Sequence, residues 1–89
     1  MARYFLHLRD SIDIAIDEEG FEFDSMEALR ACMVRSARDT MTGDVLKGHL
    51  DLTLRIDAET ADGVVAASVP FIQALEIKYP DPEPRRATW

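Results

Sequence analysis

The residues LTLRIDAETADGVVAASVPF (52–71) set out a β-hairpin more plainly than any other part of this chain. Apolar and polar side chains alternate on both sides of Asp62-Gly63, which is a strong signal for a two-residue turn. Pro70 marks an edge or a strand end. With the turn as the loop, apolar residues face each other on one side of the hairpin: Ala58 with Ala67, Ile56 with Val69, and Leu54 with Phe71.

A second hairpin is predicted near the N-terminus. Residues 3–9 alternate with an apolar side, Asp10-Ser11 has turn chemistry, and residues 12–17 alternate again. A two-residue loop would pair apolar positions with polar ones, so we expect a three-residue loop. That loop places Leu8 opposite Ile14 and Leu6 opposite Ile16.

Between the hairpins, the spacing predicts one long helix over residues 25–47. Asp24 stands three residues before Glu27, which resembles a capping box, and Gly48 is a natural residue to end the helix. Asp17-Glu18-Glu19-Gly20 forms a polar turn before it, with Gly20 suited to a positive φ. One apolar face recurs every three or four residues: Met26, Leu29, Met33, Ala37 and Met41.

The predicted order is therefore β-β-α-β-β. We expect an α+β domain of two layers over residues 1–77, in which a four-stranded antiparallel sheet carries one long helix on one face. The strand order within the sheet stays open. Residues 78–89 are rich in proline and charge, so we expect a flexible tail.

Charge is distributed unevenly along the chain. The net charge is −7, and residues 10–27 hold eight acids and no base. Such a band repels phosphate backbones and attracts basic protein surfaces, so direct nucleic-acid binding is not expected. Two interpretations stay open, a solubilising surface and a site that engages a basic partner. The acidic patch that we single out consists of Asp17, Glu18, Glu19 and Glu22.

Several classes of site have no support in the sequence. Phosphate-binding and dinucleotide-binding glycine motifs and a nucleophile elbow are missing, so no cofactor and no catalytic residue is predicted. Cys32, His7 and His49 are too scattered for a zinc site, and no metal is predicted. The lone cysteine excludes an internal disulfide, which fits a cytoplasmic protein, and no apolar run is long enough for a membrane helix.

The face of the sheet that the helix leaves uncovered offers a contact surface. Phe5 is an apolar residue there, beside His7 and Arg9, and aromatic and arginine side chains are favoured at interfaces. We therefore name Phe5, His7 and Arg9 as interface candidates. We interpret His7 as a half-exposed strand histidine, while a catalytic role with Tyr4 in a cleft is the rival hypothesis.

The chain also resembles a known family. The opening RYFLHLRD (3–10), the turn DEEG (17–20), the helix segment Ser36-Ala37-Arg38, and Pro70-Phe71 with Ala74 are similar to a family of short bacterial proteins described only as a domain of unknown function. Its members open with a tyrosine-aromatic-x-histidine-x-arginine-aspartate-glycine string, and Ser11 departs from that glycine. The resemblance spans residues 2–77 and implies a bacterial origin and this topology, with no activity.

Taken with the missing catalytic motifs, these features favour a small non-enzymatic cytoplasmic module that acts through protein–protein contacts. It would bind a protein partner or a second copy of itself, through the open sheet face or an edge strand. Two alternatives remain: an acidic inhibitor or nucleic-acid mimic that occupies a basic surface of a partner, and a small ligand-binding domain or enzyme that uses His7.

Overall fold

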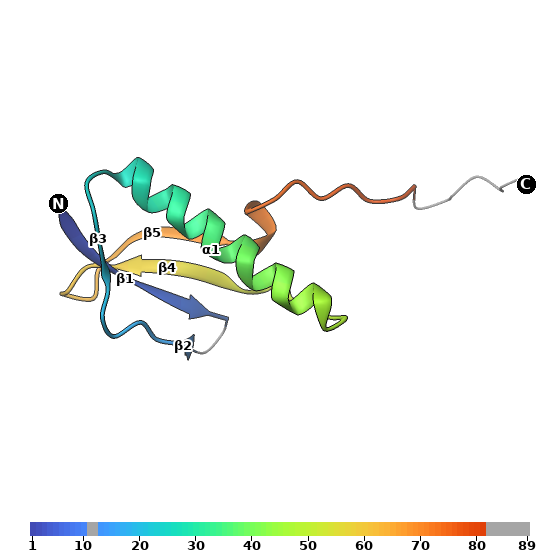
Figure 1. The fold of residues 1–89 in the computed structure, drawn as a ribbon, viewed down its shortest axis with the longest axis horizontal. Helices are drawn as coiled ribbons and strands as arrows, with labels where there is room; N and C mark the ends of the chain where they lie inside the picture. The colour runs from blue at the N-terminus through green and yellow to red at the C-terminus, as the bar shows by residue number, and fades with distance from the viewer. Residues whose placement is uncertain (11–12, 82–89) are drawn as a thin grey trace, which may run out of the picture.

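Five short strands and one long helix build the protein, whose computed structural model describes residues 1–10 and 13–81 (Figure 1). The elements are β1 (Ala2–Arg9), β2 (Asp13–Ala15), β3 (Phe21–Phe23), α1 (Met26–Leu46), β4 (Arg55–Glu59), β5 (Val65–Pro70) and a short 3-10 helix, η1 (Phe71–Gln73).

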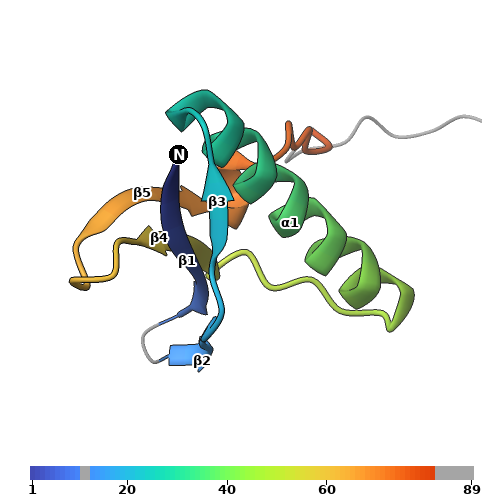
Figure 2. The same cartoon turned by 60° about the vertical axis from the view of Figure 1, so that its left-hand side comes forward.

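The sheet is antiparallel throughout, with the order β2-β1-β4-β5. β3 adds to the first half of β1, where Ala2 lies opposite Phe23 and Tyr4 opposite Phe21. β2 and β3 thus follow one another along the same side of β1, and α1 crosses one face of the sheet (Figure 2). This arrangement leaves β1 and β4 in the middle and β5 at one edge.

The predicted fold class is confirmed: the protein is α+β, with one long helix on an antiparallel sheet. The element order differs slightly, because residues 21–23 form a third strand before the helix where the sequence suggested only a lead into it. Alternating Phe21, Glu22 and Phe23 suits a strand, and the open edge of β1 provides the partner.

The first hairpin follows the predicted register for only one pair. Arg9 lies opposite Asp13 as expected, but a bulge then places Leu8 opposite Ala15, so the predicted pairing of Leu8 with Ile14 and of Leu6 with Ile16 is wrong. The reason lies at Asp17. The Leu6 amide donates to its carboxylate at 3.1 Å, and this bond replaces a strand-to-strand bond. β2 therefore ends at Ala15, before Ile16. Residues 11–12 of the predicted turn lie outside the described part of the chain.

The second hairpin confirms the predicted register. Ile56 lies opposite Val69 and Ala58 opposite Ala67, and the Phe71 amide donates to the Leu54 carbonyl at 2.9 Å. The turn is longer than predicted, because the Thr60 amide donates to the Val64 carbonyl and encloses three residues. A bulge next to the turn absorbs the extra residue, so the ladder beyond it keeps its alignment.

The helix bounds agree with the prediction, while its N-terminal cap is one residue later than expected. Ser25, rather than Asp24, accepts the Ala28 amide with its hydroxyl oxygen at 3.0 Å. At the other end Gly48 has φ +81°, and the amides of Gly48 and His49 bond back to the last turn of the helix. This pair of bonds is the Schellman arrangement, which satisfies the last carbonyls.

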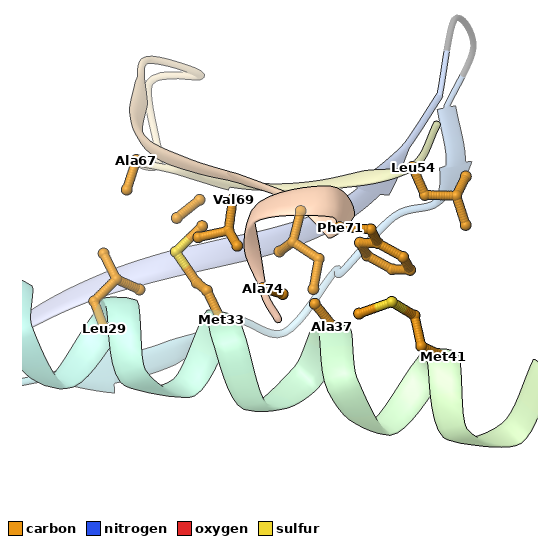
Figure 3. Close-up of a cluster of buried hydrophobic side chains, with 11 residues drawn as sticks. Leu29, Met33, Ala37, Met41, Leu54, Ala67, Val69, Phe71 and Ala74 are labelled. Carbon is orange, nitrogen blue, oxygen red and sulfur yellow. The ribbon is translucent and has the colours of Figure 1, made fainter. Parts of the chain in front are cut away.

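The core lies between α1 and the sheet (Figure 3). Four of the five residues predicted for the inner helix face are buried, and the fifth, Met26, is 43% exposed. Met41 and Phe71 point toward each other at one end of the cluster in Figure 3. The buried apolar residues are Leu29, Met33, Ala37, Met41, Leu54, Ile56, Ala58, Ala67, Val69, Phe71 and Ala74.

The C-terminal part of α1 extends beyond the sheet. Met41 is the last buried residue of the helix, and the turns that follow run past the ends of the strands (Figure 1). Val45 and Leu46 are exposed there. Among the described residues no helix has the length and apolar character needed to cross a membrane. Of the predicted tail, residues 78–81 are exposed, and residues 82–89 lie outside the described part.

The inner helix face can be tested with two methionines. We expect Met33→Ala to lower the free energy of unfolding by about 2–5 kcal/mol, because it removes a fully buried side chain and leaves a cavity. Met26→Ala is the matched control and should cost less than about 1 kcal/mol, since Met26 is only partly covered. Urea denaturation followed by far-ultraviolet circular dichroism measures both. Equal losses would contradict this placement of the helix.

Candidate functional site

The outer face of the sheet, opposite α1, is organised around the carboxylate of Asp57 in β4. Asp57 is only 4% exposed. The Ser68 hydroxyl donates to it at 2.6 Å from β5, the Arg9 guanidinium at 3.2 Å from β1, and the Arg55 Nε at 3.2 Å from β4 itself. The Arg9 guanidinium also donates to the carboxylate of Glu59, which lies two residues further along β4 on the same face. We call these five residues the Asp57 cluster.

Asp57 stays ionised despite its buried position. Burial by itself raises the pKa of a carboxyl group, but the hydrogen bonds from Ser68, Arg9 and Arg55 outweigh it and hold the pKa of Asp57 below its ordinary value. Among the described residues, every buried side-chain nitrogen or oxygen has a hydrogen-bond partner. The cluster therefore closes the outer face as a satisfied polar layer.

His7 is part of this closed layer. The prediction that His7 is half-exposed is wrong. Its side chain is 7% exposed, because neighbouring side chains and the turn after β2 cover it. Its Nδ1 accepts the Asp17 amide at 3.1 Å, and its Nε2 lies 3.7 Å from a Glu59 carboxylate oxygen. An Nδ1 that accepts an N–H carries no proton, so the neutral ring is protonated at Nε2, on the side of Glu59.

Asp17 differs from the other residues of the predicted acidic patch. One of its carboxylate oxygens accepts the Leu6 amide, and the other accepts the amides of Glu19 and Gly20 at 3.1 and 3.0 Å. Partial burial opposes ionisation, but these three bonds hold the pKa of Asp17 below its ordinary value. Asp17 thus ties the turn to β1. Glu18, Glu19 and Glu22 are exposed, and Glu22 lies 3.9 Å from Arg3.

Phe5 packs against this turn. Its ring carbon Cε2 lies 2.9 Å from the point where a Cβ on Gly20 would stand, and the Tyr4 carbonyl oxygen lies 3.0 Å from it. Gly20 also has φ +74°. The turn therefore requires glycine both for its backbone conformation and for the contact with the ring. The three interface candidates lie together on the outer face, where Phe5 is half-buried, His7 is buried and Arg9 is ion-paired. Their role as an interface stays a prediction.

The other candidates are separated from His7. Tyr4 lies on the opposite face of β1, where it packs against the core and its hydroxyl approaches the Met26 sulfur at 3.7 Å. Tyr4 and His7 consequently do not share a cleft. Cys32 is half-buried on α1. Within residues 1–10 and 13–81, no group of three or more acidic, histidine or cysteine side chains is arranged to hold a metal ion.

An open groove lies on the helix side of the sheet, between α1 and the segment that joins β2 to β3. Its volume is about 350 Å³. Phe21 and Ile16 form its outer wall and are 56% and 50% exposed. On the helix side, Cys32, Ser36 and Thr40 line the groove one turn apart, on the same face of α1. Their side chains are small, and the groove therefore stays open. The lining residues are Leu6, Leu8, Ala15, Ile16, Asp17, Phe21, Cys32, Ser36, Thr40 and Ile56.

The groove and the ion pairs were not predicted from the sequence. Alternation along the second hairpin puts Asp57 and Ser68 on its polar side, but the pairing of Asp57 with Arg9 requires β1 to lie next to β4, and the sequence leaves the strand order open. The sequence signal for this pairing is the opposite charge of Arg9 on β1 and of Asp57 and Glu59, at alternating positions of β4. The groove has no local signal, because its walls come from α1, β1 and the segment after β2.

The Asp57 cluster predicts an acid-sensitive fold. A folded-state pKa below the unfolded value of about 3.9 contributes stability above that pH, and the contribution is lost as the pH falls through the folded pKa. Asp57→Asn should lower stability at pH 7 by about 1.5–3 kcal/mol and flatten the loss below about pH 4. Asp62→Asn, in the exposed loop before β5, is the control. Denaturation between pH 7 and pH 2 measures the effect; an unchanged acid limb in Asp57→Asn would contradict it.

The contact between Phe5 and Gly20 predicts a second difference. Gly20→Ala should cost about 1–3 kcal/mol, because the new Cβ meets the ring and the Tyr4 carbonyl at a positive φ. Gly63→Ala has a similar φ of +84° but open space around it, so about 1 kcal/mol is expected. Thermal denaturation compares the two. In a Phe5→Ala background the extra cost at Gly20 should shrink, and an undiminished cost would exclude the ring as its cause.

Comparison with known proteins gives one match. No curated protein and no solved structure matches the chain. A family model described as Domain of unknown function (DUF6894) matches residues 3–72, which include the helix and all five strands except Ala2, the first residue of β1. The matched region covers most of the chain, and the chain therefore belongs to the DUF6894 family.

Proposed function

We propose that this protein is a small non-enzymatic interaction module, and that it binds a partner protein through the groove between α1 and the β2–β3 segment. The observation that carries the proposal is the groove itself. It is a mostly apolar hollow with two large exposed side chains, Ile16 and Phe21, on its wall. Exposed apolar surface of this kind marks sites of protein contact.

The contrast between the two faces of the sheet supports this choice. On the outer face, polar groups are paired with one another inside the Asp57 cluster, so a partner would have to replace good hydrogen bonds. The groove, by contrast, is an open hollow lined by the apolar side chains of Leu6, Leu8 and Phe21. A partner that inserts an apolar side chain there gains the free energy of removing this surface from water.

The charges beside the groove indicate which partners fit. Asp17 lines it, and the exposed Glu18 and Glu19 follow directly in the turn. Acidic groups next to an apolar hollow favour a segment in which an apolar side chain is flanked by lysine or arginine. The acidic patch then selects the partner, in agreement with the alternative that the band engages a basic protein surface.

An enzymatic use of His7 has less support. Its two ring nitrogens face the Asp17 amide and Glu59, and the side chain is buried. A general base needs access to substrate as well as an orienting partner. The predicted cytoplasmic location is part of the same proposal and is consistent with the single cysteine.

Selection of short random peptides displayed on phage tests the function. The wild-type chain is immobilised sparsely, and enriched peptides are measured by fluorescence anisotropy against wild type, Phe21→Glu and Ile16→Asp. We expect peptides with an apolar residue beside lysine or arginine, a loss of affinity of about tenfold or more in both variants, and weaker binding at high salt.

Val64→Asp is the matched control, because Val64 is similarly exposed but lies in the loop between β4 and β5. Its affinity for the peptides should equal that of the wild type. Peptides that bind Phe21→Glu as well as the wild type would refute the groove as the binding site. Enrichment without apolar anchors would refute the proposed function.

A further inference from the structure

We infer that a second copy of this chain fills the groove with Leu46, so that two copies form a reciprocal dimer in which each helix end enters the groove of the other. This inference rests on the proposed function of the groove and names its occupant. The protein itself carries a segment with the required chemistry, an exposed apolar side chain beside a basic one: Leu46 followed by Lys47.

The end of α1 is built to contact something outside its own fold. Leu46 is 84% exposed, more than any other large apolar side chain of the described residues except Met1. The last turns extend past the strands, so nothing in the described chain shields them (Figure 1). The helix nevertheless ends in a well-formed Schellman arrangement, which fixes the direction in which Leu46 and Lys47 are presented.

The groove and the helix end can meet twice in one dimer. Leu46 lies about 15 Å further along α1 than Ser36, in the middle of the groove's helical wall. Two helices that run antiparallel about a two-fold axis bring each Leu46 to the other's Ser36, and the axis then passes at the level of Met41, about 3 Å along α1 from Gly43. Apart from its chain neighbours and the backbone of α1 itself, no atom of the described residues lies within 4 Å of the position of a Cβ on Gly43, so the helices can approach closely there. Such an interface is self-complementary, as two-fold dimers require.

Charge supports the same pairing. In the partner's groove Lys47 comes near Asp17 and the exposed Glu18, which belong to the acid-rich region without bases. The net charge of −7 otherwise repels a second copy. A basic residue placed beside the acidic turn relieves this repulsion locally and selects one orientation of the two copies.

Analytical ultracentrifugation over a range of concentrations tests the dimer. The expected species are the 10.0 kDa chain and its dimer in reversible exchange. Leu46→Ser should raise the dimer dissociation constant by about tenfold or more, with an unchanged circular dichroism spectrum, because Leu46 is exposed in the single chain. Lys47→Glu should weaken the dimer and make it less sensitive to salt. Ile72→Ser, which changes an exposed residue next to β5, is the control and should leave the dimer intact.

The chain also offers a direct test of the contact. Cys32 is its single cysteine, and Cys32→Ser removes that thiol. In the variant that adds Ser36→Cys and Leu46→Cys, the two thiols of one copy are about 15 Å apart along α1, too far for a bond within the chain. Oxidised glutathione should therefore join position 46 of one copy to position 36 of the other, and is itself reduced as the two thiols lose their hydrogens. Peptide mapping identifies the link, and a variant with Ile72→Cys in place of Leu46→Cys should give none to position 36.

A chain that stays at the monomer mass at all concentrations would overturn this inference, as would a dimer that Leu46→Ser leaves unchanged. A cross-link between two copies of position 46 without one to position 36 would do the same. If these results accompany peptides that still bind the groove, the proposed function stands and only the second copy is excluded as occupant. Peptides that fail to bind, beside a dimer lost in Leu46→Ser, would leave this inference standing with the chain itself as the partner.

Discussion

A single helix can cover only one face of a sheet. On the other face of this sheet, the buried carboxylate of Asp57 organises a layer of paired polar side chains. An ionised group at 4% exposure is tolerated only when its charge is balanced and its lone pairs are used. Arg9 on β1 and Arg55 on β4 itself balance the charge, and together with Ser68 on β5 they occupy the lone pairs. The order β1-β4-β5 and the polar outer layer are therefore two aspects of one constraint.

The turn after β2 is also held by hydrogen bonds to a carboxylate, that of Asp17. Asp17 binds three backbone amides, and its own amide binds His7, so the short strands β2 and β3 are held to β1 without a continuous ladder. Holding the chain here also keeps it away from α1. The groove is the space that results, and its floor is the inner side of β1. A requirement for stability on one face thus shapes the groove on the other.

How much of this the sequence predicts depends on the range of the interaction. The pairing of Ile56 with Val69 follows from alternation and a turn, both of which are local. The inner helix face follows from a spacing of three and four residues. The first hairpin departs from its pattern after Arg9 and Asp13, since the Asp17 carboxylate competes with the strand for the Leu6 amide. His7 is buried by a turn ten positions away, and no pattern along β1 records that.

The edge strand β5 bears on whether the protein aggregates at high concentration. Residues 63–75 contain no charge, and an uncharged edge strand invites other chains to add to it. Two irregularities oppose this. The bulge near Ala66 twists one end of the strand, and Pro70 offers no amide at the other. The sheet can therefore expose Val65 at its rim and still stop at β5, which opposes the open-ended strand stacking that leads to fibres.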